Sequence, residues 1–280
     1  MIRKLAALLA ALCLLAIPAN AARQWQLVSR EDFAGPLAPH WTVYDGSPKC
    51  CLATVWSPEL AQTRDGRLKL TATRQADGAW LAAGAGAAGW PVMVRTYGKY
   101  VARIRMDRGE GVSAVALLWP KSNAWPPEID YYEIAGTDGD RVRETATLHR
   151  AGDNAQTHSS YRGDLTQWHT ITLEWLPGSI TYFVDNTRTG QVTDSSYIPH
   201  EPMWPAFQLQ IDQDKAGNPL ISTTGPVSMW VDWFAVYAPA GDSIGTAPVE
   251  GRRPDWWAIA VLGALIAAFA GVIFVRRRTR

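Results

Sequence analysis

The central part of the sequence predicts an all-β fold, either a sandwich or a barrel. Arg67–Thr73, Lys99–Met106 and His169–Trp175 alternate between polar and apolar residues, the pattern of a half-buried strand. Two more strand-like stretches, Ile180–Val184 and Met229–Tyr237, follow, and Gly, Pro, Asn and Asp turns separate the series. No amphipathic helix of useful length interrupts it. Many short strands with turns between them are typical of all-β domains.

The N-terminus reads as an export signal. Arg3 and Lys4 precede Leu5–Ile17, an apolar run that is short for a membrane span. Pro18 ends this run, and Ala19–Ala21 has the small-x-small pattern that a signal peptidase cleaves. We expect residues 1–21 to be a signal peptide. A retained anchor is the alternative, which the short run and the processing pattern disfavour.

The C-terminus predicts a membrane span. Trp256–Val275 contains no charged residue, and its twenty residues would form a helix ~30 Å long, about the hydrocarbon thickness. Residues 276–280 are rich in arginine and would form a cytoplasmic tail. Residues 239–255 are rich in Gly, Pro and Ala and would be a linker. A buried helix, or a sorting tail removed after export, is the alternative.

Residues 22–238 have the length of one all-β domain. The net charge of +1 gives no indication of nucleic-acid binding. Fourteen tryptophans are many, and in an exported protein such aromatics either line sugar-binding clefts or fill the core. Cys50 and Cys51 remain after signal removal, and a disulfide between neighbours would be strained because their Cα atoms are ~3.8 Å apart.

Two motif matches lack the structural context that their chemistry needs. Gly84–Gly89 fits the dinucleotide pattern G-x-G-x-x-G, but Trp90 and Pro91 follow, where a helix would have to begin. We expect a flexible loop of small residues there. Gly241–Gly245 fits the nucleophile-elbow pattern but falls in the predicted linker, so we interpret it as a chance match.

The segment most informative about chemistry holds Glu128, Asp130 and Glu133 within six residues. In a regular strand Glu128 and Asp130 would share one face, and Glu133 would lie on the other. A β-bulge at Tyr131 or Tyr132 would bring all three carboxylates to one face. Crowded carboxylates ionise at different pH values, which suits glycoside hydrolysis. Without the bulge, the strand would be acidic with a structural or metal-binding role, and the residues alone leave both interpretations open.

Glu128–Glu133 resembles the bulged E-x-D-x-x-E signature of glycoside hydrolase family 16. The resemblance extends through an ordered set of segments over roughly residues 28–237. These segments are Tyr97–Arg103, Leu117–Pro120, Thr147–His149, Trp168–Asp185 and Val231–Tyr237.

The resemblance implies a jelly-roll sandwich of two antiparallel sheets with a cleft, and a retaining mechanism. Glu128 would be the nucleophile and Glu133 the general acid and base, their carboxyl groups ~5–5.5 Å apart. Asp130 would help to hold the orientation and charge of the nucleophile.

The resemblance also implies roles in sugar binding. Trp119 and Trp125 would be sugar platforms, and His149 would neighbour the acid/base. Core packing is the alternative for these three residues. Gln208 and Gln210 would donate hydrogen bonds to sugar hydroxyls, unless they only form a solvated strand face.

Two further points follow from the family pattern. Many members carry a structural calcium ion away from the cleft, and Asp232 matches its aspartate position; no cofactor is required for catalysis. The segment Gly89–Val94 departs from the pattern, because related bacterial sequences have a Gly-rich cleft strand there. This departure puts the choice of substrate in question.

The sequence therefore predicts a retaining endo-glycosidase that acts on a β-1,3- or β-1,3-1,4-glucan or a related exopolysaccharide. A transglycosylase with the same residues, and a non-catalytic carbohydrate-binding protein on the same fold, are the alternatives. We expect a monomer at the cell membrane, spanning it once, with its domain on the periplasmic or extracellular side.

Overall fold

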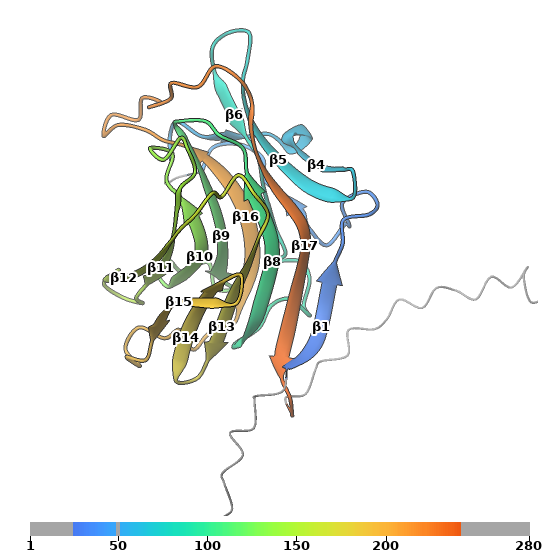
Figure 1. Cartoon of the computed structure of the whole chain (residues 1–280), viewed down its shortest axis with the longest axis vertical. Coiled ribbons are helices and arrows are strands. Elements are labelled where there is room, and N and C mark those ends of the chain that lie inside the picture. Colours follow the sequence, from blue (N-terminus) through green and yellow to red (C-terminus); the bar gives the residue numbers. More distant parts are fainter. Residues whose placement is uncertain (1–24, 49–50, 242–280) are drawn as a thin grey trace, which may run out of the picture. The chain divides into compact units, whose positions relative to one another are not determined.

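The computed structural model describes residues 25–48 and 51–241, which form a sandwich of two antiparallel sheets (Figure 1). They belong to one compact unit, residues 1–243; the second unit, residues 244–280, lies outside the described part. The predicted signal peptide, membrane segment, basic tail and most of the linker also lie outside the described residues. Within those residues, no helix has the length and apolar character that a membrane span requires.

The first sheet has ten strands, eight of them in the spatial order β15-β14-β13-β8-β17-β5-β6-β3, with β1 added beside β17 and β4 beside β5. Its strands are β1 (Trp25–Glu31), β3 (Val55–Trp56), β4 (Ala61–Arg64), β5 (Arg67–Arg74), β6 (Trp80–Ala82), β8 (Gly98–Met106), β13 (His169–Leu176), β14 (Ser179–Val184), β15 (Thr187–Val192) and β17 (Val227–Pro239). All pairings are antiparallel except the short contact of β3 with β6. A 3-10 turn, η1 (Pro58–Leu60), leads into β4.

The second sheet has seven strands in the order β12-β11-β10-β9-β16-β7-β2. Its strands are β2 (Thr42–Val43), β7 (Gly84–Gly86), β9 (Val112–Pro120), β10 (Glu128–Ile134), β11 (Arg143–His149), β12 (Gln156–Arg162) and β16 (Met203–Ile211). Strands that are distant in the sequence, such as β9 and β16, are neighbours in this sheet, as in a jelly roll.

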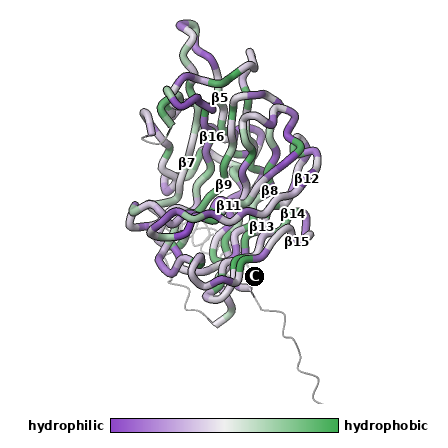
Figure 2. Tube along the Cα trace, turned by 90° about the vertical axis from the view of Figure 1, so that its left-hand side faces the viewer, coloured by the Kyte–Doolittle hydropathy of each residue, from purple (hydrophilic) through white to green (hydrophobic). Residues whose placement is uncertain are grey.

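The hydrophobic core lies between the two sheets, and the period-2 pattern of the sequence explains why. Leu68 and Leu70 on β5 and Phe207 and Leu209 on β16 are fully buried, while the residues between them are partly exposed. Figure 2 shows apolar residues recurring along the central strands. Trp175 fills the core as well, and its indole N–H donates to the carbonyl of Pro199 at 3.2 Å.

The segment Gly84–Gly89 is not the flexible loop that we expected from its composition. Gly84–Gly86 forms β7, which pairs with β16 on one side and with β2 on the other. The expectation failed because the segment holds small residues for packing and not for mobility. A Cβ atom at Gly84 would lie 2.4 Å from the ring of Tyr44, and one at Gly86 would lie 2.4 Å from the ring of Trp204.

The second sheet therefore does contain a Gly-rich strand. We expected it within residues 89–94 and took its absence there as a departure from the family pattern, but it lies earlier in the chain, at β7. Its glycines let Tyr44 and Trp204 lie directly over the sheet surface.

Replacing Gly86 tests this packing. In Gly86→Ala the added methyl group meets Trp204 and Tyr44, and we expect the free energy of unfolding to fall by about 1–3 kcal/mol. Urea denaturation followed by tryptophan fluorescence measures the change. Gly35→Ala is the matched control, because a Cβ atom there meets nothing within 4 Å. Equal stability of the two variants would contradict the close approach.

Candidate active site

Strand β10 contains a β-bulge, as the carboxylate spacing required. On the β9 side, Asp130 pairs with Leu117 and Tyr132 pairs with Ala116, so Tyr131 is an extra residue in β10. The register on the β11 side shifts in the same stretch. The side-chain alternation of β10 therefore changes phase within the bulge.

The bulge brings Glu128, Asp130 and Glu133 to the same face, which confirms the predicted phase change. All three line one cleft on the outer face of the second sheet. Tyr131 and Tyr132 point the other way and are each 1% exposed in the core. The buried tyrosines fix the strand against the first sheet, so the carboxylates are held on a rigid element.

The cleft has a volume of about 820 Å³, the size of a small-molecule or oligosaccharide site. It brings together every substrate-binding residue predicted from the sequence: Trp119, Trp125, His149, Gln208 and Gln210. Its other lining residues are Tyr44, Pro48, Cys51, Trp56, Val115, Leu117, Asn123 and Trp204. Cys50, the neighbour of Cys51, lies outside the described residues.

Aromatic side chains form much of the cleft wall. Trp119 and Trp204 pack on a small apolar cluster that includes Val115 and Leu117, on the outer face of the sheet. Trp125 is 47% exposed, which leaves its indole available to a ligand. Such flat, partly exposed rings are suited to stacking on sugar rings.

Three aromatic residues of the cleft, Tyr44, Trp56 and Trp204, were not predicted from the sequence. Trp204 could have been found, because it lies an even number of residues before Gln208 and Gln210 on a strand and so shares their face. Tyr44 and Trp56 carry no such signal. Tyr44 directly follows the two-residue strand β2, Trp56 lies on the two-residue strand β3 of the other sheet, and their ring centroids are 4.7 Å apart.

Glu128 lies at the start of β10 and accepts a hydrogen bond from Trp125. The indole Nε1–H donates to Glu128 Oε2 at 2.7 Å. This donor stabilises the ionised form of the carboxyl group. Trp125 therefore has a polar contact with the proposed nucleophile in addition to its exposed ring.

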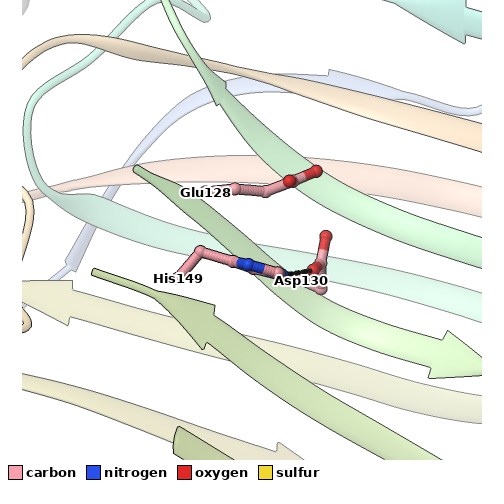
Figure 3. Close-up of side chains that lie close together, drawn as sticks. All are labelled: Glu128, Asp130 and His149. Atoms are coloured by element: carbon pink, nitrogen blue, oxygen red, sulfur yellow. Dashed lines mark hydrogen bonds and ion pairs between the residues drawn. The ribbon is translucent and has the colours of Figure 1, made fainter. Parts of the chain in front are cut away.

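Asp130 is paired with His149, which lies on β11. Figure 3 shows the Asp130 carboxyl group between His149 and Glu128. His149 Nε2 is 3.1 Å from Asp130 Oδ2, and His149 Nδ1 is 2.7 Å from Asn154 Oδ1. The direct partner of His149 is thus Asp130, and the imidazole is held from both of its nitrogens.

Glu133 lies beyond the bulge and is bonded to Thr147. The Thr147 hydroxyl donates to Glu133 Oε2 at 2.9 Å, and its oxygen is also 3.2 Å from His158 Nδ1. Thr147 is 4% exposed. This contact fixes one oxygen of Glu133, so the orientation of the carboxyl group is set from the neighbouring strand.

The environment shifts the carboxyl groups toward their protonated forms. Burial, and then the charge of Asp130, raise the pKa of Glu128 to about 9. The same two causes raise the pKa of Glu133, and burial raises the pKa of Asp130 itself. Because like charges resist joint ionisation, the cluster retains a proton near neutral pH. A general acid needs such a proton on Glu133, whereas the Trp125 N–H group and the charge of His149 act to lower the pKa of Glu128 and so favour the ionised form that a nucleophile needs.

His149 shifts in the direction that favours its cation. Burial lowers its pKa, but the hydrogen bonds to Asp130 and Asn154 and the charge of Asp130 outweigh burial and raise the pKa to about 9. An imidazolium beside the carboxyl cluster offsets part of its negative charge. In this way a positive group lies within reach of Glu128 and Asp130 in an otherwise acidic site.

The surroundings of Asp232 do not fit the calcium ion that the family resemblance suggested. Asp232 Oδ1 lies 3.2 Å from Arg67 Nε, and Oδ2 lies 3.4 Å from Arg103 Nε. A calcium ion needs six or more oxygen ligands, and two guanidinium groups at this carboxylate would repel it. Asp232 instead links β17 to β5 and β8 on the outer face of the first sheet.

Comparison with known proteins extends the resemblance. A sequence model of the glycosyl hydrolases family 16 matches residues 51–231. Two endo-1,3-1,4-beta-glycanases of Rhizobium meliloti (strain 1021), ExsH and EglC, are 26% and 28% identical to this chain over 145 residues, which is 51% of the chain. The alignment covers 31% of each relative, so the chain spans about a third of their length.

Solved structures show the same fold at low identity. The catalytic domain of an endo-1,3-beta-glucanase (laminarinase) from Thermotoga petrophila RKU-1 superposes with a TM-score of 0.68 at 20% identity, covering 78% of this chain and 99% of that domain. A beta-1,3-1,4-glucanase (lichenase) from a mouse hindgut metagenome gives 0.62 at 19% identity, covering 75% and 98%.

The family match runs from the cleft rim at Cys51 to the last strand and takes in more than half of the chain. Its span includes the bulged strand and the three carboxylates that the strand presents. The chain therefore belongs to the glycosyl hydrolases family 16.

Proposed function

We propose that this protein is a retaining endo-glycosidase that hydrolyses internal β-glycosidic bonds of a glucan. The observation that carries the proposal is the bulge in β10, which presents Glu128 and Glu133 on one face of a rigid strand and in one cleft. Each glutamate has its own hydrogen-bond donor, Trp125 for the first and Thr147 for the second. A retaining glycosidase needs two such carboxyl groups in its cleft, one as the nucleophile and one as the general acid and base.

The two glutamates take different roles in the proposed reaction. Glu128 attacks the anomeric carbon while Glu133 gives its proton to the departing glycosidic oxygen, and a glycosyl-enzyme intermediate forms. Glu133, now ionised, takes a proton from water, which attacks the same carbon and releases Glu128. Asp130 and its partner His149 place one negative and one positive charge beside the nucleophile. Trp125 holds one oxygen of Glu128 through its N–H group and so sets the orientation of the nucleophile.

The lining of the cleft supports a neutral glucan as the substrate. Among the residues that line it in the described part of the chain, none is lysine or arginine, whereas five are aromatic. A sulfated galactan would need cationic partners for its anionic groups. Neutral sugar rings need flat apolar faces and amide donors, which the tryptophans and the pair Gln208 and Gln210 provide. The names of the two Rhizobium relatives point to β-1,3-1,4-linked substrates.

We further propose that the protein is exported and anchored. The support is the sequence of residues 1–21 and of residues 256–275, which read as a signal peptide and a membrane span. The glycosidase domain would then act at the cell surface as a monomer without a required cofactor. Protease treatment of spheroplasts, in which the outer side of the cytoplasmic membrane is accessible, tests this: the domain should be digested while a cytoplasmic marker survives, and protection of both would contradict export.

The nucleophile is tested by Glu128→Gln in the full chain. Without the carboxylate no glycosyl-enzyme can form, so we expect release of reducing ends to fall on the order of a thousandfold or more. The assay panel is β-1,3-glucan, mixed-linkage β-1,3-1,4-glucan, carrageenan and agarose. We expect release from one of the two glucans and none from the sulfated carrageenan.

Glu174→Gln is the matched control, because Glu174 pairs with Lys99 on the outer face of the first sheet and should not affect catalysis. Longer chains formed without new reducing ends would indicate a transglycosylase. Retention of the glucan on both wild type and Glu128→Gln, with no product from either, would indicate a binding protein and overturn the proposed enzyme.

Asp130→Asn tests the electrostatic account. The charge of Asp130 raises the pKa of both Glu128 and Glu133, so its removal makes both groups easier to ionise and lowers both pKa values. Both limbs of the pH–activity profile should move to lower pH. Asp140→Asn, which alters an exposed carboxylate bonded to Arg108, should leave the profile unchanged. A profile that keeps its position in Asp130→Asn, or moves to higher pH, would contradict the assignment.

A further inference from the structure

We propose that Glu128, Asp130 and His149 form a binding site for a divalent transition-metal ion of the zinc type, and that the bound ion inhibits hydrolysis in the cleft. Each residue offers one ligand atom, and these three atoms lie within 4.8 Å of one another. They come from two neighbouring strands, β10 and β11, where Glu128 pairs directly with His149.

The Asp130 side chain supplies an independent reason to expect a cation. Asp130 is 5% exposed, and among the described residues its buried Oδ1 atom accepts no hydrogen bond unless the neighbouring Glu128 carboxyl group carries a proton. Figure 3 shows one Asp130 oxygen linked to His149 and the other turned toward Glu128. A buried carboxylate oxygen that faces a second carboxyl group needs either a proton or a positive ion between them.

His149 is oriented as a metal ligand requires. Its Nδ1 atom lies 2.7 Å from Asn154 Oδ1, so an Nδ1–H group donates there and leaves Nε2 directed at Asp130. A ring nitrogen fixed by a hydrogen bond from the opposite nitrogen is the usual arrangement of metal-binding histidines. His149 Nε2 and Asp130 Oδ2 are hydrogen-bonded at 3.1 Å, so once the Nε2 proton is lost they lie close to the separation of about 3.3 Å between two ligands of a tetrahedral zinc ion.

The ligand types select which ion binds. One imidazole nitrogen and two carboxylates suit Zn²⁺, Co²⁺ or Cu²⁺, with water from the cleft in the remaining position. Mg²⁺ and Ca²⁺ prefer six or more oxygen ligands, and an imidazole is a poor replacement. The described lining of the cleft holds no lysine or arginine, so the positive group that the metal must replace there is the imidazolium of His149, which loses its Nε2 proton on binding.

Metal binding would compete directly with catalysis. Glu128 is the proposed nucleophile, and a carboxylate bound to zinc cannot attack an anomeric carbon. The inhibition rests on the function proposed above, whereas the binding itself does not. Binding and activity can therefore be measured separately, so that failure of one is not mistaken for failure of the other.

Isothermal titration of the untagged full chain with ZnCl₂ tests the binding. We expect one saturable site per chain in the wild type and no comparable site for MgCl₂. His149→Gln should weaken Zn²⁺ binding at least about tenfold. Asn154→Gly removes the group that orients His149 while suiting the positive φ of 56° at that position, and it should weaken binding less than loss of the ligand. Circular dichroism checks that each variant is folded.

Two control variants locate the ion. His200→Gln alters a histidine bonded to Tyr97 outside the cleft and should bind Zn²⁺ as the wild type does. Cys51→Ser should also retain binding, and loss there instead would assign the ion to cysteine. The proposed site would be overturned if folded His149→Gln bound Zn²⁺ as well as the wild type does, or if no saturable binding occurred. A proton shared by Glu128 and Asp130 would then explain their contact.

In glucan assays, saturating Zn²⁺ should abolish the release of reducing ends, and a chelator should restore it. Full activity in the Zn²⁺-bound chain would overturn the proposed inhibition.

Discussion

The chemistry of this protein depends on one extra residue in strand β10. A regular strand would direct Glu133 into the core, where a charged group without a partner is strongly unfavourable. The bulge at Tyr131 reverses the alternation, so Tyr131 and Tyr132 fill the core and Glu133 emerges beside Asp130 in the cleft. Packing and catalysis are thus set by the same local distortion, and neither could be changed without the other.

Keeping three carboxyl groups on a partly buried sheet face is unfavourable, and the neighbouring strands compensate for it. Trp125 donates to Glu128, Thr147 donates to Glu133, and His149 pairs with Asp130. These contacts also differentiate the groups, because each carboxyl group has its own donor. Burial still raises the pKa values of Glu128 and Glu133. A raised pKa is what lets one carboxyl group hold a proton for catalysis.

Period-2 alternation predicted an all-β sandwich or barrel, and the spacing of the acidic residues indicated the carboxylate cluster, because both are local properties of the sequence. The choice of a jelly-roll sandwich came from the family resemblance. The bulge could be predicted only conditionally: Glu133 shares the face of Glu128 only if the side-chain alternation of β10 changes phase between them. Strand β7 was misread, because its glycines are required by Tyr44 and Trp204, which are distant in the sequence. The arginine partners of Asp232 come from β5 and β8, so their pairing with it depends on the tertiary fold.

The most direct test of the account is the stereochemistry of the reaction, because it reports whether one glutamate of the bulged strand forms a covalent intermediate. Proton NMR of a β-glucan digest, recorded during the first minutes with the full chain, distinguishes the anomers of the new reducing end. We expect the β-anomer to appear first and the α-anomer to follow by mutarotation, as two successive displacements require. Initial appearance of the α-anomer would mean a single displacement by water and would contradict Glu128 as the nucleophile.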